Sequence, residues 1–202
     1  MKKEIELKRT WNQVSIKDYF KIIDILINED LDEVEKIDMI MLTLTSITPN
    51  ELSQLSISDY SKLKKTIEFV FDEVKPESVK EYILINDKHF ECDIKLDKVV
   101  AGQYLMLQNI LKIEDYKERI KKCIGVFVRP QGIKWGDFDY DENTEFLFNN
   151  MSIKDAVSLS AFFLHTQKRL LKRFQAYMNK EKKMEMKKLK KSNQLHLLHN
   201  GE

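Results

Sequence analysis

The sequence is poor in glycine, proline and cysteine. Five glycines and three prolines in 202 residues leave few positions for turns of special geometry, so long helices with short connections are expected. The same shortage of glycine argues against the glycine-rich loops that hold phosphates in nucleotide-binding folds. The two cysteines, Cys92 and Cys123, form neither a CxxC pair nor a zinc-binding spacing. We therefore interpret them as two reduced, mostly buried thiols of an intracellular protein.

Long apolar runs are missing as well. Every uninterrupted apolar stretch is far shorter than the roughly 18 residues that a membrane-spanning helix requires. The basic N-terminal residues have no apolar run behind them, which argues against a secretion signal. We therefore expect a soluble protein that does not associate with a membrane.

The residues that are abundant predict a mainly helical domain. Apolar residues make up 43% of the chain and charged residues 33%, which suits a hydrophobic core with long solvated helix faces. The predicted fold class is α+β and predominantly α-helical: a helical domain with one small β-hairpin, which a third strand could extend, and a long C-terminal helix. We place a single globular domain at residues 1–178 and a basic, flexible tail at 179–202.

Three short segments carry the signature of a helix N-terminus. Each has a serine followed three residues later by an aspartate, at Ser15, Ser56 and Ser152. The serine hydroxyl can accept from the N3 amide, and the aspartate can accept from the N-cap amide. With apolar residues at helical spacing, the predicted helices are 16–28, 32–46, a short turn from Pro49, 58–73, 98–112, 114–128, and a long last helix from Ser152 to about residue 180.

The apolar spacing also predicts which side chains these helices bury. In the first two helices we expect Tyr19, Ile23 and Val34 to face the core. In the later helices we expect the same of Phe71 and Tyr116.

A change of period from 3.6 to 2 predicts a β-hairpin at about 81–95. Its strands are 82–85 and 89–94, and Asn86-Asp87-Lys88 forms the turn because asparagine and aspartate tolerate positive φ. Since a lone hairpin is marginally stable in water, it must pack on helices or gain a third strand. Residues 4–8 are the candidate for that strand.

Residues 135–142 combine aromatic and acidic side chains after a break at 129–132. The motif Asp137-x-Asp139-x-Asp141 resembles the start of a calcium loop, but its sixth position is glutamate instead of glycine and its twelfth is phenylalanine. We therefore expect a solvated acidic loop, which Phe146 and Phe148 attach to the core.

Motifs for catalysis are missing from the whole chain. There is no GxSxG, no cysteine in a nucleophile motif, and no P-loop, Rossmann or kinase glycine pattern. His196 and His199 could share a helix face as metal ligands, but no third ligand is near them in sequence. The sequence thus predicts a protein that is not an enzyme and has no cofactor and no metal. An enzyme of unrecognised type is the third-ranked alternative.

Positive charge is concentrated near the C-terminus. Residues 168–191 hold 11 basic and 2 acidic side chains, a net of +9, and because the whole chain is +1, the rest sums to −8. This segment can attract an anionic partner, whereas the rest of the chain cannot. The candidate residues for anion binding are Lys168, Arg169, Lys172, Arg173, Lys180, Lys182, Lys183, Lys187, Lys188, Lys190 and Lys191.

The order of these elements resembles a known group of phage proteins. The segments that carry the resemblance are LTSITPNELSQLSISDYSKL (44–63), KPESVKEYILINDKHFECDI (75–94), KVVAGQYLMLQNIL (98–111) and MSIKDAVSLSAFF (151–163). The chain is similar over about residues 11–175 to small tailed-phage proteins of the tail assembly chaperone or minor virion protein type. Those proteins have a helical N-terminal part, a hairpin, a Gly-Gln-Tyr motif, here Gly102-Gln103-Tyr104, and a helical C-terminal half.

The resemblance implies a function without catalytic residues. It implies a non-enzymatic phage assembly or virion structural protein, which binds other virion or tail proteins in the host cytoplasm during assembly or within the virion. The alternative is a charge-driven, sequence-nonspecific nucleic-acid-binding protein that uses residues 168–191. Both interpretations leave oligomerisation open.

Overall fold

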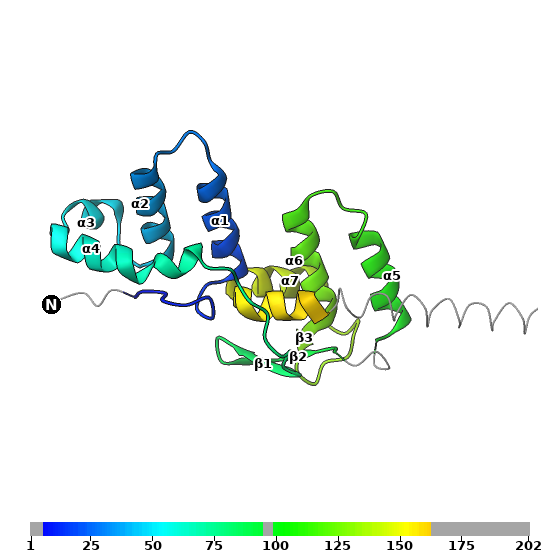
Figure 1. Ribbon diagram of the computed structural model, residues 1–202. Coiled ribbons are helices and arrows are strands. Elements are labelled where there is room, and N and C mark those ends of the chain that lie inside the picture. The colour runs from blue at the N-terminus through cyan, green and yellow to red at the C-terminus, as the bar shows by residue number, and fades with distance from the viewer. Residues whose placement is uncertain (1–5, 95–98, 163–202) are drawn as a thin grey trace, which may run out of the picture. The chain divides into compact units, whose positions relative to one another are not determined.

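The computed structural model describes residues 6–94 and 99–162. Backbone contacts divide the chain after Ala161, and all elements below belong to the first unit. The fold confirms the predicted class: it is predominantly helical, with a small three-stranded antiparallel sheet (Figure 1). The predicted boundary between residues 178 and 179 and most of the predicted last helix lie outside the described residues.

The N-terminal half forms the predicted series of short helices. It contains α1 (Ile16–Ile27), α2 (Glu33–Leu44), α3 (Pro49–Ser53), α4 (Ile57–Thr66) and a 3-10 turn, η1 (Glu68–Phe71). Ser15 and Ser56 cap α1 and α4 as predicted, each accepting from the amide three residues on at 3.1 Å. Ser152 caps the last helix in the same way, at 3.0 Å.

The aspartates in these three caps differ from the prediction. Each accepts a hydrogen bond from the capping serine hydroxyl, at 2.9 Å in the Ser15–Asp18 pair, and not from the N-cap amide. Where the third helical residue is glutamate the reciprocal bond does form, as from the Thr48 amide to Glu51 at 2.7 Å. The difference follows from length, because aspartate is one methylene shorter than glutamate.

Several predicted core positions are wrong, because the helices pack on more than one neighbour. α1 contacts both α2 and α7, so its buried face is wide and contains Ile22 and Ile25 in place of Tyr19 and Ile23. The predicted core residues that are exposed instead are Val34, Phe71 and Tyr116. The predicted helix 58–73 tightens after Thr66 into η1, which buries Val70 and turns Phe71 outward.

The hairpin confirms the prediction, with a shorter turn. Strands β1 (Tyr82–Ile85) and β2 (Lys88–Cys92) are joined by Asn86 and Asp87 alone, whose φ values are 48° and 60°. Two consecutive positive φ values define the type I′ turn that suits the twist of a two-residue hairpin.

The third strand is not the predicted one. Val128–Pro130 forms β3, which pairs with β2 in the sheet order β1-β2-β3. Leu7, from the predicted strand, makes only an isolated bridge with Thr45. β3 is the direct continuation of α6 (Tyr116–Phe127), so the packing of α6 brings it to the sheet edge without a connecting loop. The predicted chain break at 129–132 is therefore partly strand.

The prediction of a loop through residues 135–142 is wrong from Tyr140 onward. Helix α7 (Tyr140–Asn150) begins there, and the Asp139 carboxylate accepts from the Glu142 amide at 2.9 Å. Acidic residues are favourable at a helix N-terminus because they oppose the positive end of the dipole. α7 contacts both α1 and α6 and buries Leu147 and Phe148, so it lies at the centre of this unit (Figure 1).

An antiparallel bridge holds two helix starts together. Ser15 and Ser152 pair, and the amides of Ile16 and Ile153 donate to carbonyls of the opposite segment at 3.1 and 2.8 Å. Both helix starts have the same sequence, Ser-Ile-Lys-Asp. The last helix is described over 153–162. Helix α5 (Ala101–Ile110) packs against α6.

We predict that Gly125→Ala destabilises the protein. Gly125 lies where α6 packs on α7, and an added Cβ would lie 2.0 Å from the Thr144 hydroxyl oxygen and 3.1 Å from its Cβ. The overlap should outweigh the higher helix propensity of alanine and cost about 1–3 kcal/mol in the free energy of unfolding. Urea denaturation measures the change. In a Thr144→Ala background the cost should be smaller, and equal costs in both backgrounds would contradict this packing account.

Candidate functional site: a pocket beside Trp11

The predicted anion-binding residues, Lys168 through Lys191, all lie outside the described residues. Within residues 6–94 and 99–162, no helix is long and apolar enough to cross a membrane. In the same part of the chain, no three His, Cys, Asp or Glu side chains are grouped so that they could hold a metal ion. His89 is exposed on β2, as the strand alternation predicts.

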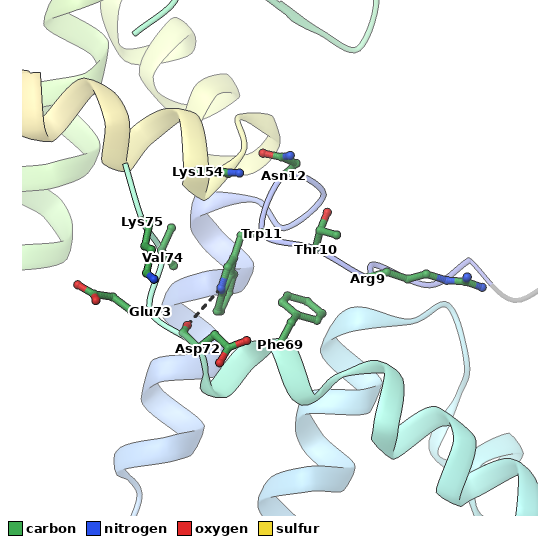
Figure 2. A pocket seen from close by; sticks show the side chains of 10 residues that line it. All are labelled: Arg9, Thr10, Trp11, Asn12, Phe69, Asp72, Glu73, Val74, Lys75 and Lys154. Carbon is green, nitrogen blue, oxygen red and sulfur yellow. Dashed lines mark hydrogen bonds between the residues drawn. The ribbon is translucent and has the colours of Figure 1, made fainter. Parts of the chain in front are cut away.

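A pocket of about 620 Å³ opens beside Trp11. Three separate regions line it: the N-terminal segment before α1, η1 with the connecting segment (residues 72–81) that leads to β1, and the first turn of the last helix (Figure 2). The lining residues are Arg9, Thr10, Trp11, Asn12, Phe69, Asp72, Glu73, Val74, Lys75 and Lys154.

Trp11 and Phe69 form the aromatic wall of the pocket. Their ring centroids are 5.1 Å apart at an interplanar angle of 82°, and Tyr19 meets Trp11 edge-on at 5.5 Å. The indole N–H donates to the Asp72 carbonyl at 3.3 Å, drawn as a dashed line in Figure 2. This contact attaches the connecting segment to the N-terminal segment. Edge-to-face pairs of this kind fix ring orientation, so the wall is preformed.

The rim of the pocket carries charges of both signs. Lys154 forms an ion pair with Glu77 at 2.5 Å. Within the described part of the chain, no ion pair forms at Arg9 or Lys75, and both side chains are exposed. Asp72 and Glu73 are exposed on the same rim. A ligand with both a carboxylate and a cationic group could therefore find an opposite charge here.

The connecting segment gives the pocket one extended side. Its side chains are mostly exposed, and the Glu77 amide donates to the Ser158 hydroxyl at 2.9 Å. Lys80 also pairs with Asp155 at 3.1 Å. The segment is therefore held against the last helix, and at its end the Glu81 carbonyl accepts from the Cys92 amide of β2 at 2.9 Å.

The lining combines aromatic side chains, exposed charges of both signs and the connecting segment. Aromatic surface, exposed charges and extended backbone are the elements that hold a polypeptide segment. Sequence reasoning missed this site because its residues come from three regions that no single spacing connects. The available signal was Trp11, an aromatic residue shortly before a capped helix.

The Gly102-Gln103-Tyr104 motif has a structural role. Gln103 is 1% exposed, and its amide nitrogen donates to Asp93 and to the Val126 carbonyl, both at 2.8 Å. Its amide oxygen accepts from the Val100 amide at 3.0 Å. Asp93 also pairs with Arg129 at 3.4 Å. Gln103 thus connects the start of α5 to the ends of β2 and α6, and it contacts no cavity wall of the Trp11 pocket.

Comparison with known proteins adds no relative. Neither protein-family models, nor curated proteins, nor solved structures give a match to the chain.

Both thiols are poor nucleophiles. Cys92 is buried and Cys123 half-buried, and neither is in a disulfide. Burial raises the pKa of Cys92 to about 12, with further contributions from the nearby Asp155 and Asp93 carboxylates. Burial also raises the pKa of Cys123 to about 11. The thiolate, which is the reactive form, is therefore rare at neutral pH.

We predict that stability falls in alkaline solution. The folded pKa of each thiol lies above its ordinary value of 9.0, so folding favours the neutral form. This stabilisation is complete below about pH 9 and is lost as the pH rises through 11 to 12. Burial also raises the pKa of Tyr140 to about 12. The stability that its neutral form contributes is therefore also lost as the pH rises. Urea midpoints at a series of pH values measure the loss. Cys123→Ala should make it shallower, and an unchanged slope would contradict the assignment.

Proposed function

We propose that this protein is a non-enzymatic assembly or virion structural protein of a tailed phage, which acts by binding other proteins. The observation that carries the proposal is the Trp11 pocket, whose aromatic wall, mixed charges and extended side suit a polypeptide segment. The phage assignment is supported by the order of sequence elements over residues 11–175 and by segments such as 75–94. Its place of action would be the host cytoplasm during assembly, or the virion.

A polypeptide is the ligand class that uses all parts of this pocket. The faces of Trp11 and Phe69 can contact an apolar side chain, and burying such a side chain contributes about 1.5–3 kcal/mol. Arg9 and Lys75 can pair with acidic side chains, while Asp72 and Glu73 lie within the same lining for basic ones. Because opposite charges share the rim, the order of charges along a bound segment would determine specificity more than affinity.

We predict that the pocket holds a tail or capsid protein encoded beside this gene. Co-expression of the protein with those neighbours, followed by affinity purification at about 0.5 M salt, tests the contact. Salt at that level screens exposed charge pairs beyond a few ångströms, so retention reports the apolar contact. Trp11→Ala should lower retention by at least about tenfold, which corresponds to 1.4 kcal/mol.

The contribution of the charged rim can be tested against a matched control. Arg9→Glu with Lys75→Glu should weaken binding at low salt, whereas Lys134→Glu, an exposed lysine outside the pocket lining, should leave it unchanged. If every neighbour binds the Trp11→Ala protein as well as the natural protein, the pocket is not the binding site. If no neighbour is retained, the assembly role is contradicted.

A second candidate function is supported by the charge of residues 168–191. Their net charge of +9 against −8 for the rest of the chain favours charge-driven, sequence-nonspecific binding of nucleic acid. Each phosphate neutralised on duplex DNA adds about −0.9 to the slope of log affinity against log salt.

We predict for this candidate a steep salt slope that deletion of residues 179–202 reduces. The deletion removes 7 of the 11 basic side chains of residues 168–191, so the slope should fall by more than half. Retention on immobilised duplex DNA across a salt series measures it. DNA binding that is independent of salt, or that survives the deletion unchanged, would eliminate the candidate.

A further inference from the structure

β1 is an edge strand with an open side. In the order β1-β2-β3 it has one neighbour, β2. The pairs Ile83–Phe90 and Ile85–Lys88 flank the two-residue turn in alternation with Leu84–His89. In a two-residue hairpin the pair next to the turn exchanges hydrogen bonds, so Ile83 and Ile85 direct their backbone groups to β2. The backbone groups of Tyr82 and Leu84 consequently point away from the sheet.

The side chains at this edge are also available. Ile83 and Ile85 are buried on the core face, at 6% and 7% exposure, while Tyr82 and Leu84 are 47% and 60% exposed on the outer face. Within the described part of the chain, no hydrogen bond reaches the outward backbone groups of Tyr82 or Leu84. The edge thus presents both unpaired backbone and apolar surface.

The two edges of the sheet differ in how they are protected. β3 has three residues and ends at Pro130, which cannot donate a ladder hydrogen bond. The β1 sequence Tyr-Ile-Leu-Ile contains no charge, no proline and no bulge, which are the usual devices against edge pairing. The sheet can therefore be extended at β1 and not at β3.

We propose that β1 pairs antiparallel with β1 of a second copy of this chain. This surface lies apart from the Trp11 pocket lining, so the inference does not depend on the proposed function. In the two-fold register centred on Ile83, Tyr82 faces Leu84 of the partner subunit, and the same pair forms again across the axis. Each pair exchanges both N–H···O bonds, and the two three-stranded sheets become one.

Complementarity favours a second copy over an unrelated strand. The register places an aromatic side chain opposite an aliphatic one twice, a favourable cross-strand pair. It also sets no like charges opposite each other, because Lys80 faces Asn86 of the partner subunit and Glu81 faces Ile85 of the partner subunit. An isologous contact of this kind closes on itself, so the assembly stops at a dimer.

Sedimentation equilibrium from about 1 to 100 µM tests the proposal. The mass should rise with concentration from 24.1 kDa toward twice that value. Leu84→Lys places a charge opposite Tyr82 of the partner subunit and should raise the dissociation constant at least about tenfold. Tyr82→Glu with Leu84→Lys should restore association, because the register then pairs Lys with Glu twice.

Leu105→Lys is the matched control. Leu105 is 59% exposed on α5, close to the 60% of Leu84, so its replacement should leave the dissociation constant unchanged. Amide hydrogen exchange adds a readout at the backbone: the Tyr82 and Leu84 amides should become protected on association, whereas Ile83 and Ile85 are protected throughout. A monomer over the whole concentration range, or a dimer that Leu84→Lys does not weaken, would overturn the proposal.

Discussion

The backbone bridge between Ser15 and Ser152 is the contact on which the rest of the structure depends. It joins residues 137 positions apart in sequence and brings together the first turns of α1 and of the last helix. Val14, Ile16, Met151 and Ile153 around it are all almost completely buried. Because the amides of Ile16 and Ile153 both bond to the opposite segment, the junction leaves few helix-end donors to water. Two identical Ser-Ile-Lys-Asp segments thus serve both as helix caps and as partners of each other.

The Trp11 pocket is a consequence of this junction. The N-terminal segment reaches α1 through the bridge, and the ion pair between Lys8 and Asp18 at 2.5 Å keeps it beside the helix. On the other side, Lys154 lies two residues after Ser152. The connecting segment is then held between them by the Trp11 indole and by Ser158. Three regions that are distant in sequence therefore line one pocket because a single bridge fixes two of them.

Local signals in the sequence predicted local structure. The serine caps, the start at Pro49 and the turn at Asn86-Asp87 were predictable because each depends on residues within one turn of the chain. Helix α7 was not predictable in this way. Its acidic first turn resembles a solvated loop, and its central position depends on α1 and α6. β3 was missed for the same reason: nothing in Val128–Pro130 itself distinguishes a strand, and its pairing depends on where α6 ends. The pocket was not predictable either, because three regions that are distant in sequence line it.

Several charges of the described unit are paired within it. Arg129 pairs with Glu91 and Asp93, and both carboxylates are mostly buried. Breaking such a buried pair costs about 3–5 kcal/mol, so these groups are held in place and do not serve partners. What this unit offers outward is an aromatic wall with a charged rim and a strand edge. The apolar and backbone contacts of the wall and the edge depend little on salt. Residues 168–191 instead hold excess charge that salt screens over about 10 Å. Ionic strength therefore distinguishes partners of the folded unit from partners of the basic segment.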